Sequence, residues 1–301
     1  MPFLSIIIAG HNCGETLAKT LDSLISALSG AHDYEVIIIN DASDDNTQDI
    51  INNYSETWSH YQSVEVAFNN VGKVRNKAIS IAKGQYITML DSDDLLKPGC
   101  LDRYIEFLKN QRPDMLITRL IEIRDLKKMS PEWDGLHPQA LSREEAIRRF
   151  LIHKDFQAHL IGQFISKDLY NQAPIPAMTC YEDFAIFPKL LMCSSKLFFQ
   201  SQGHYYYVKR QGSLSSTPDD EKTTNLVNCT REMERLFPDK FRWLVYCHWL
   251  DIYLKFRHRL NASQYAEVYR RVVKTRSAGF LFSPDIRFSY KKKAIKSLWI
   301  K

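Results

Sequence analysis

The sequence lacks the features that mark disulfide-rich, zinc-binding and membrane-spanning proteins. Its six cysteines are scattered, with no Cys-x-x-Cys pair and no Cys/His cluster at zinc spacing, so we expect reduced, buried thiols. No window approaches the ~20 apolar residues that a membrane-spanning helix needs. The first residues lead straight into the apolar run Leu4–Ala9, without the basic segment and long apolar core of a signal peptide. We therefore expect a cytoplasmic protein, with a peripheral position at the inner face of the cell membrane left open.

The chain also has little excess charge and no glycine-rich phosphate loop. Its formal net charge is +5 and its pI is about 8.7, which suits anionic small substrates or an anionic membrane surface better than nucleic acid. Near the N-terminus Gly10 and Gly14 are isolated, and no Lys-containing glycine loop is found there. This absence weighs against one class of enzyme, the sugar-1-phosphate nucleotidyltransferases, which use acidic metal sites on α/β sheets.

The pattern of apolar residues predicts an α/β fold. The chain has 301 residues, enough for one large domain and an appended piece. The expected strands are Leu4–Ala9, Glu35–Ile39, Val64–Phe68, Tyr86–Leu90 and Met115–Ile123, and the expected helices are Glu15–Leu28, Asp45–Tyr54, Lys73–Ala82, Leu95–Leu108 and Ser142–Ile152. This alternation predicts a mostly parallel central sheet with helices on both faces. Ser142 and Glu145 stand in capping-box order, and Pro188 should kink a helical segment or mark its start.

A second region follows, helical and rich in aromatic and basic residues. We place a boundary near Thr217, which divides the chain into residues 1–217 and 218–301. Apolar residues at helical spacing in the second region predict packing on the rest of the protein; they are Trp243, Tyr246, Trp249, Leu250 and Tyr253. The alternative is contact with an acceptor or a membrane. The ending Tyr290–Lys301, with basic residues beside Trp299 and Ile300, favours an anionic interface.

An acidic cluster ends one of the expected strands. The apolar run Tyr86–Leu90 leads directly into Asp91, Asp93 and Asp94. Carboxylate oxygens suit Mg²⁺ or Mn²⁺, which proteins commonly hold with one or two carboxylates and the phosphates of a substrate. The alternative is that Asp93 or Asp94 only caps the helix expected from Leu95.

Polar residues at three strand ends favour the cation site. Asn12, Asp41 and Asp91 all fall where an expected strand ends. Ligands of parallel sheets bind outside the carboxyl ends of the strands, so these residues should converge on one cleft. The cluster therefore indicates phosphate chemistry.

Four segments of the chain, which follow one another in the same order as in that family, resemble the inverting family 2 glycosyltransferases, which have the GT-A fold. Ile6–Asn12 keeps the first strand and its Asn but lacks the family's Pro and Tyr, and Asn40–Thr47 resembles the Asp-Asp-Gly-Ser-x-Asp-x-Thr loop with Asn40 in place of the first Asp. Asn70–Ala78 resembles the Gly-x-x-x-Arg-Asn segment, and Asp91–Asp94 the Asp-x-Asp signature. The likeness runs from Leu4 to about Ser215, two-thirds of the chain.

The resemblance implies a role for each matching residue. Donor-binding residues would be Asn12, Asp41 at the base, Arg75 near the nucleotide, Asp91 and Ser92, with Asp93 and Asp91 holding Mn²⁺ or Mg²⁺. In the pair Glu182-Asp183 the Asp would be the catalytic base. The segment Tyr206–Ser215 resembles a loop that folds over the donor, and it brings Lys209 and Arg210 to the donor's phosphates.

The implied activity is inverting, metal-dependent transfer of a hexosyl or N-acetylhexosaminyl group from a nucleotide-sugar, with uridine the expected base. The acceptor would be a saccharide or lipid-linked saccharide in bacterial capsule, lipopolysaccharide or related surface polysaccharide synthesis. Residues 1–217 would then be the GT-A catalytic domain, and 218–301 the part that meets acceptor or membrane. Asp239-Lys240-Phe241-Arg242-Trp243 resembles the Gln-x-x-Arg-Trp motif of processive synthases but has Asp in place of Gln, so we expect one sugar per encounter.

Each assignment has a structural alternative. Asp41 could start a helix at Asp44, and Arg75 could be a solvated helix charge. Glu182-Asp183 could favour a helix macrodipole, Lys209-Arg210 could be an exposed hairpin pair, and we interpret His11 as structural. A non-catalytic saccharide- or membrane-binding protein with an inherited donor pocket is a further alternative. The intact Asp91, Asp93 and Asp183 weigh against it.

Overall fold

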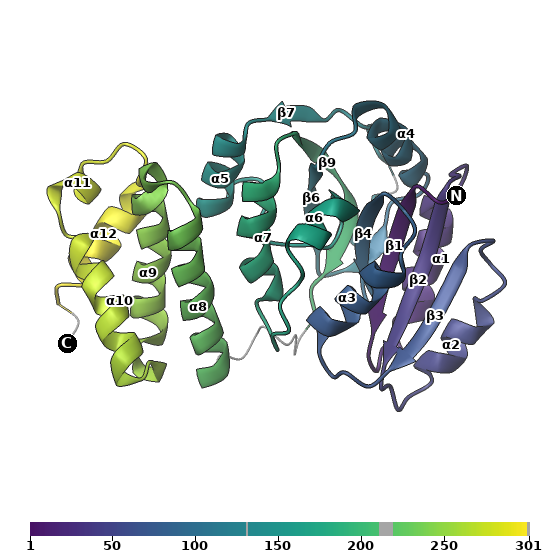
Figure 1. Ribbon diagram of the computed structural model, residues 1–301, viewed down its shortest axis with the longest axis horizontal. Coiled ribbons are helices and arrows are strands. Elements are labelled where there is room, and N and C mark those ends of the chain that lie inside the picture. Colours follow the sequence, from purple (N-terminus) through teal and green to yellow (C-terminus); the bar gives the residue numbers. More distant parts are fainter. Residues whose placement is uncertain (131, 211–218, 300–301) are drawn as a thin grey trace.

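The computed structural model describes residues 1–130, 132–210 and 219–299. In Figure 1 a twisted sheet with helices on both faces occupies one end of the molecule, and a bundle of helices occupies the other. Within the described residues the sheet has nine strands in the order β3-β2-β1-β4-β8-β6-β9-β5, with β7 added to β9. The boundary predicted near Thr217 lies outside the described residues.

The first half of the sheet is parallel, as the sequence predicts. Its strands are β1 (Leu4–Gly10), β2 (Tyr34–Asp41), β3 (Tyr61–Val66) and β4 (Tyr86–Asp91), and its helices are α1 (Leu17–Ala27), α2 (Thr47–Asn53) and α3 (Val71–Ile81). The central strands are near-continuous apolar runs because both of their faces are buried. In the register, Ala9 lies opposite both Ile39 and Asp91, so the strands end together. Asn12, Asp41 and Asp91 therefore follow or end neighbouring strands at one edge.

The remaining strands and helices extend this sheet. They are β5 (Leu95–Leu96), α4 (Leu101–Gln111), β6 (Met115–Ile123), η1 (Leu126–Lys128), β7 (Gln139–Leu141), α5 (Arg143–Leu151), β8 (Phe164–Ser166), α6 (Lys167–Gln172), α7 (Glu182–Cys193) and β9 (Leu197–Val208). β6 runs parallel to β9, whereas β8 is antiparallel to both β4 and β6. The predicted strand Met115–Ile123 is confirmed.

Two predicted elements have different bounds in the structure: a helix that begins later, and the strand predicted at Val64–Phe68, which is β3 (Tyr61–Val66). Leu95 and Leu96 do not begin a helix but pair with Tyr206 and Tyr205 of β9, and α4 starts only at Leu101. Asp93 and Asp94 therefore cap no helix. β3 ends at Val66 rather than Phe68, because the backbone N–H of Phe68 donates to the carboxylate of Asp41.

The predicted N-terminal cap of α5 is formed in part. The Ser142 hydroxyl accepts a hydrogen bond from the Glu145 backbone N–H, which confirms the predicted cap of α5. The reciprocal half of the capping box is not formed, because the Glu145 carboxylate pairs with Arg149. α7 runs through Pro188, which therefore does not mark its start. All six cysteines are free thiols, and Cys193 is the one that is exposed.

The C-terminal region is a helical bundle. It contains α8 (Asp220–Leu236), η2 (Asp239–Phe241), α9 (Arg242–Phe256), η3 (Arg257–Arg259), α10 (Ala262–Lys274), α11 (Ala278–Leu281) and α12 (Phe288–Lys296). The residues predicted to pack do so, since Tyr246, Trp249, Leu250 and Tyr253 of α9 are fully or almost fully buried and Trp243 is partly buried against the core. Among the helices of the described ranges, none is both long and apolar enough to cross a membrane.

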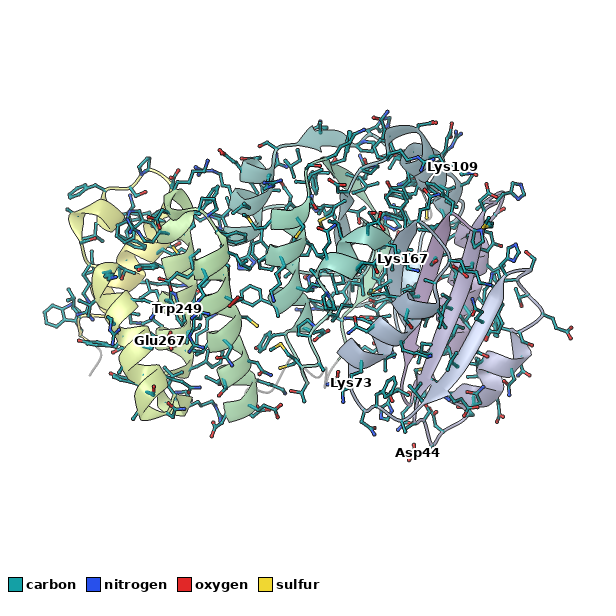
Figure 2. All side chains as sticks on the ribbon, in the orientation of Figure 1. Asp44, Lys73, Lys109, Lys167, Trp249 and Glu267 are labelled. Carbon is teal, nitrogen blue, oxygen red and sulfur yellow. The ribbon has the colours of Figure 1, made fainter. Side chains whose placement is uncertain are left out.

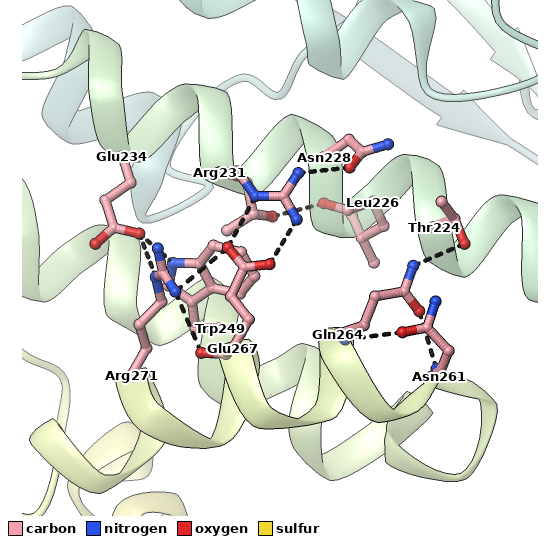
Figure 3. Close-up of polar contacts among 11 residues, drawn as sticks. Thr224, Leu226, Asn228, Arg231, Glu234, Trp249, Asn261, Gln264, Glu267 and Arg271 are labelled. Atoms are coloured by element: carbon pink, nitrogen blue, oxygen red, sulfur yellow. Dashed lines mark hydrogen bonds and ion pairs between the residues drawn. The ribbon is translucent and has the colours of Figure 1, made fainter.

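Partly buried polar contacts hold three helices of the bundle together (Figure 3). The Glu234 carboxylate on α8 accepts a hydrogen bond from the Trp249 indole at 3.0 Å and from Arg271 of α10 at 2.5 Å. Arg231 makes two hydrogen bonds to the Glu267 carboxylate, at 2.8 and 2.5 Å. Paired arginine–carboxylate bonds of this kind fix orientation as well as distance. These contacts therefore fix α8, α9 and α10 relative to one another.

The bundle contacts the sheet domain through aromatic rings on α5 and α7. The ring centroid of Phe150 on α5 lies 6.1 Å from that of Phe237, and the ring centroid of Phe184 on α7 lies 5.9 Å from that of His248. Figure 2 shows Trp249 and Glu267 within the bundle, and Asp44 and Lys73 at the lower edge of the sheet domain. Asp44 and Lys73 follow β2 and β3, so the lower edge is the one at which the parallel strands end. The predicted site residues Asn12, Asp41 and Asp91 lie at this edge.

Candidate active site

Asp41, at the end of β2, anchors the loop that follows β3. Its buried carboxylate accepts hydrogen bonds from the backbone N–H groups of Phe68, Asn69 and Asn70, at 2.6, 3.0 and 3.0 Å. Asp41 does not start a helix, because α2 begins at Thr47, whose N–H bonds to Asp45. Its predicted contact with the nucleotide base stays a prediction.

Asn12 joins the loops that follow β1 and β2. Its side-chain oxygen accepts a hydrogen bond from the Asp44 N–H, and its own N–H donates to the Ser43 hydroxyl, each at 2.9 Å. The backbone of Asn12 has φ 46°, a left-handed conformation that Asn tolerates better than most residues. The ring of His11 contacts the Asp41 carbonyl oxygen at 2.6 Å, in keeping with a structural role.

Three carboxylates after β4 form a cluster of oxygen ligands. One oxygen each from Asp91, Asp93 and Asp94 lie within 4.8 Å of one another. Asp94 is almost completely buried, and its carboxylate accepts hydrogen bonds from the Tyr205 hydroxyl at 2.7 Å and the Val208 N–H at 2.8 Å. A set of convergent hard oxygens fits Mg²⁺ or Mn²⁺. Ser92, between two of these residues, offers its carbonyl oxygen to the Thr16 hydroxyl.

The negative charges of the cluster repel one another. Burial, reinforced by Asp91, raises the pKa of Asp94 to about 8. Burial and then Asp91 also raise the pKa of Asp93, although Arg210 opposes the effect. Asp93 and Asp94 thus lack sufficient countercharge, which a divalent cation would supply.

We expect cation binding at this cluster to release protons and to strengthen as pH rises. The pKa of Asp94 is higher in the folded chain than its ordinary value, so the folded protein binds more protons than the unfolded one and loses stability from a pH of about 4 to about 8. A cation needs the carboxylate, and each displaced proton makes affinity rise by about tenfold per pH unit below that pKa. Calorimetry of Mn²⁺ binding, in buffers of different ionisation enthalpy, measures the proton release. An affinity unchanged between pH values of about 6 and 8 would contradict this linkage.

Arg75 of α3 connects the cluster to a second pair of carboxylates. One terminal nitrogen lies 3.1 Å from an Asp91 oxygen, and the other lies 2.8 Å from Glu182 and 2.9 Å from Asp183. Arg75 is only 5% exposed, so the solvated-charge alternative is wrong. Burial alone would lower the pKa of Arg75, but its three carboxylates raise it above the ordinary value. The guanidinium therefore stays charged.

Glu182 and Asp183 begin α7 and lie beside this guanidinium. The Asp183 carboxylate also accepts a long hydrogen bond, 3.3 Å, from the Leu160 N–H. Burial raises the pKa of Asp183 while Arg75 opposes the rise, and burial followed by the Asp183 charge raises the pKa of Glu182 to about 7. Their place in the first turn suits the helix dipole, but their contacts with Arg75 show a second reason for two acids here.

Lys209 and Arg210 follow β9 and differ in their contacts. Arg210 donates to the Asp93 carbonyl oxygen at 3.1 Å and lies 3.7 Å from its carboxylate. The Lys209 ammonium pairs instead with Glu122 at 2.6 Å. Only Arg210 of this pair is thus shown at the cluster. The rest of the predicted donor loop, residues 211–215, lies outside the described residues.

Sequence reasoning missed three residues of the site. It treated Asp94 only as part of the acidic run or as a cap, and it gave no role to Tyr205, which holds Asp94 and accepts at its hydroxyl from the Asp91 N–H. It also missed His159, whose ring centroid lies 6.1 Å from that of Tyr207. Burial lowers the pKa of His159, while Asp91 opposes this shift. No sequence motif marked His159.

A cavity of about 610 Å³ lies elsewhere, between α4 and residues 133–137. Gly99, Arg103 and Trp133 are among the residues around it, and none of the carboxylates described above lines it. The convergence of charged groups, rather than this cavity, identifies the candidate active site.

Comparison with solved structures identifies the fold. A crystal structure of S. aureus TarS 1-349 matches with a TM-score of 0.63 and 16% identity, covering 98% of this chain and 79% of that one. TarS 1-349 in complex with UDP-GlcNAc matches with a TM-score of 0.61 and 19% identity, with the same coverage of both chains. The fold is therefore the GT-A fold.

Comparison with known sequences identifies the family. Residues 5–154 match the profile of Glycosyl transferase family 2, and the chain belongs to this family. It is 29% identical over 224 residues to the poly(ribitol-phosphate) beta-glucosyltransferase of Bacillus spizizenii, covering 71% of this chain and 33% of that protein. It is 26% identical over 245 residues to TuaG of Bacillus subtilis, a putative teichuronic acid biosynthesis glycosyltransferase, covering 80% and 92%. The chain thus spans about a third of the first relative's length.

Proposed function

We propose that this protein is an inverting, cation-dependent glycosyltransferase that moves a sugar from a UDP-sugar to a saccharide acceptor in bacterial surface polysaccharide synthesis. One observation carries the proposal. Arg75 lies between Asp91 of the cation site and Asp183, the candidate base, at 3.1 and 2.9 Å. The groups needed to stabilise a departing diphosphate and to activate an acceptor hydroxyl are therefore neighbours.

The residues at the cluster serve the leaving group. Asp91, Asp93 and Asp94 would hold Mn²⁺ or Mg²⁺, which supplies Lewis-acid stabilisation of the negative charge on a departing diphosphate. Arg210, already beside Asp93, can donate further hydrogen bonds to the same phosphate oxygens. Arg75 neutralises Asp91 from the protein side and fixes its orientation.

Asp183 serves the nucleophile. A sugar hydroxyl is a poor nucleophile until its proton is removed, and a positioned carboxylate that removes it contributes about 10²–10⁴ in rate. Arg75 favours the ionised form that can accept this proton. Attack on the anomeric carbon from the side opposite the diphosphate inverts its configuration, through a transition state with oxocarbenium character.

The comparisons support the choice of substrates. Structures of TarS 1-349 contain UDP-GlcNAc or UDP, which supports a uridine donor and a hexosyl or N-acetylhexosaminyl group. The names of the relatives refer to poly(ribitol-phosphate) and teichuronic acid, which supports an acceptor of the surface-polymer type, free or lipid-linked. We further propose that Asn12, Asp41, Arg75, Asp91, Ser92, Lys209 and Arg210 lie around the donor.

We expect the protein to release UDP from a UDP-sugar in the presence of Mn²⁺, and Asp93→Ala to lower this rate by about 10²–10³ because a ligand to the cation is lost. A panel of UDP-sugars, with UDP measured by chromatography, tests both statements. Asp134→Ala, an exposed carboxylate outside the cluster, is the matched control and should retain full activity. Pyrophosphate released from a nucleoside triphosphate would instead show a nucleotidyltransferase, and donor binding without any turnover would show a non-catalytic protein.

A further inference from the structure

Exposed apolar side chains are concentrated at the end of the bundle. Apart from Met1, every large hydrophobic side chain of the described residues that is at least half exposed lies beyond residue 281. These side chains are Phe282 (84%), Trp299 (83%), Phe288 (70%), Leu298 (54%) and Ile295 (50%). Single exposed apolar residues are common on soluble proteins, whereas a concentration of this kind marks an interaction surface.

The inner face of α12 is docked firmly on the bundle. The Tyr290 hydroxyl and the Lys293 ammonium both bind the Asp251 carboxylate of α9, at 2.7 and 2.6 Å. Ala294 is fully buried, and the backbone oxygen of Ser297 accepts a hydrogen bond from Arg276 at 3.0 Å. The outward side chains of α12 are therefore held in place by the packing of its opposite face.

The outer face combines apolar and basic side chains. Phe288, Lys292 and Ile295 recur at intervals of four and three residues, which places them in one stripe along the helix. Trp299 follows three residues after the helix ends at Lys296 and is exposed. The Lys292 ammonium lies 4.8 Å from the centroid of the Phe288 ring. Lys296 and Leu298 are exposed beside this stripe. We call these six residues the α12 face.

The charged side chains of the α12 segment itself are all basic. From Ile286 to Lys301 the sequence contains Arg287 and five lysines and no carboxylate. Of the lysines, Lys293 is taken up by Asp251, while Lys292 and Lys296 are exposed. Lysines at the edge of an apolar stripe can bury their stems and keep the ammonium in water.

We propose that the α12 face docks on a membrane surface that contains anionic lipid, with α12 lying in the plane of the interface. Phe288, Ile295 and Trp299 would enter the headgroup region, and Lys292 and Lys296 would meet anionic headgroups. A second copy of the chain fits this face less well, because a two-fold pair would bring the lysines of one copy against those of the other. The proposal concerns binding alone and does not depend on the transferase reaction.

Vesicle co-sedimentation tests the proposal with the full chain. We expect binding to vesicles of phosphatidylcholine with phosphatidylglycerol, and binding at least about tenfold weaker to phosphatidylcholine alone. Lys292→Gln with Lys296→Gln should weaken the first by about tenfold, since each lysine near an anionic surface contributes a several-fold factor. Phe288→Ser with Ile295→Ser and Trp299→Ser should weaken it by more than about tenfold, through lost apolar burial. Ile25→Ser with Leu126→Ser, two partly exposed apolar residues outside the bundle, is the matched control and should bind like the parent.

Two further measurements make the test decisive. Brominated lipid should quench the fluorescence of the parent, and Trp299→Phe should lose most of this quenching, because Trp299 is the most exposed tryptophan of the described residues. Circular dichroism should show that the variants fold, since the inner face of α12 is unchanged. Equal vesicle binding by the apolar triple variant and the parent would overturn the proposal. So would a parent that ignores vesicles and self-associates through this face, as measured by sedimentation velocity. UDP release from a soluble donor should be the same in all of these variants, so failure here leaves the proposed transferase activity intact.

Discussion

Asp183→Asn should lower kcat by about 10²–10⁴, the usual contribution of a general base, while the donor binds as before. The amide has nearly the shape of the carboxylate but cannot take the acceptor's proton. It also retains an oxygen that can accept the hydrogen bond from the Leu160 N–H. Initial rates of UDP release with acceptor present, together with donor titration by calorimetry, separate the loss of the base from a loss of binding.

Asp168→Asn is the matched control for this substitution. Asp168 also stands in the first turn of a helix, α6, but its side chain is exposed. Its variant should keep the parental rate. Glu182→Gln tests whether Glu182 is the base instead. Glu182 pairs with the same Arg75 guanidinium, and burial raises its pKa to about 7. If Glu182→Gln abolished transfer while Asp183→Asn retained it, the base would be Glu182.

Arg75→Met should destabilise the protein by roughly 3–5 kcal/mol at neutral pH, because removing one partner of a buried ion pair leaves uncompensated charge. Here the buried Arg75 guanidinium forms ion pairs with Asp91, Glu182 and Asp183. Without it the pKa values of Glu182 and Asp183 in the folded state rise further, so the folded variant binds more protons than its unfolded chain. Its stability should fall as pH rises from about 4, and the deficit should be smaller at a pH of about 5 than at about 8. Urea unfolding at several pH values measures this dependence.

Arg103→Met separates the buried ion pairs from a general loss of arginine. The Arg103 side chain is 65% exposed and lies 3.5 Å from Glu106 on the same helix. Its loss should change the free energy of unfolding by less than about 0.5 kcal/mol. A deficit for Arg75→Met that is the same at every pH would indicate lost packing rather than unpaired carboxylates.

Much of the sheet and part of the site could be predicted from local pattern. The parallel strands β1, β2 and β4 read as continuous apolar runs because both of their faces are buried, and β6 was predicted to the residue. Parallel strands end at a common edge, so the positions of Asp41 and Asp91 followed from the strand assignments. The cap of α5 was also predictable, because Ser142 and Glu145 are three residues apart.

Elements that depend on distant partners were not predictable in this way. Leu95 and Leu96 continue an apolar helical pattern, but the unpaired edge of β9 takes them into the sheet across more than a hundred residues of sequence. Contacts between distant segments also decided which aromatic side chains of the C-terminal region are buried. Trp249 is buried against α8 and α10, whereas Trp299 on a similar aromatic and basic segment is exposed because only the other face of α12 meets the bundle.

By itself the sequence determined the α/β class, the edge of the sheet that carries the candidate site, and the place of Asp91 and Asp93 at the end of a strand, since these depend on periodicity and on the order of residues along single strands. Asp183 was indicated only by the resemblance of the pair Glu182-Asp183 to a family motif. Tertiary structure alone decided which charges meet. Arg75 and Glu182 are 107 residues apart in sequence, and they touch because α3 and α7 are brought together at the carboxyl ends of the strands. Coulombic pairing acts over a few ångströms, so it follows the packing of the elements and leaves no local signal in the chain.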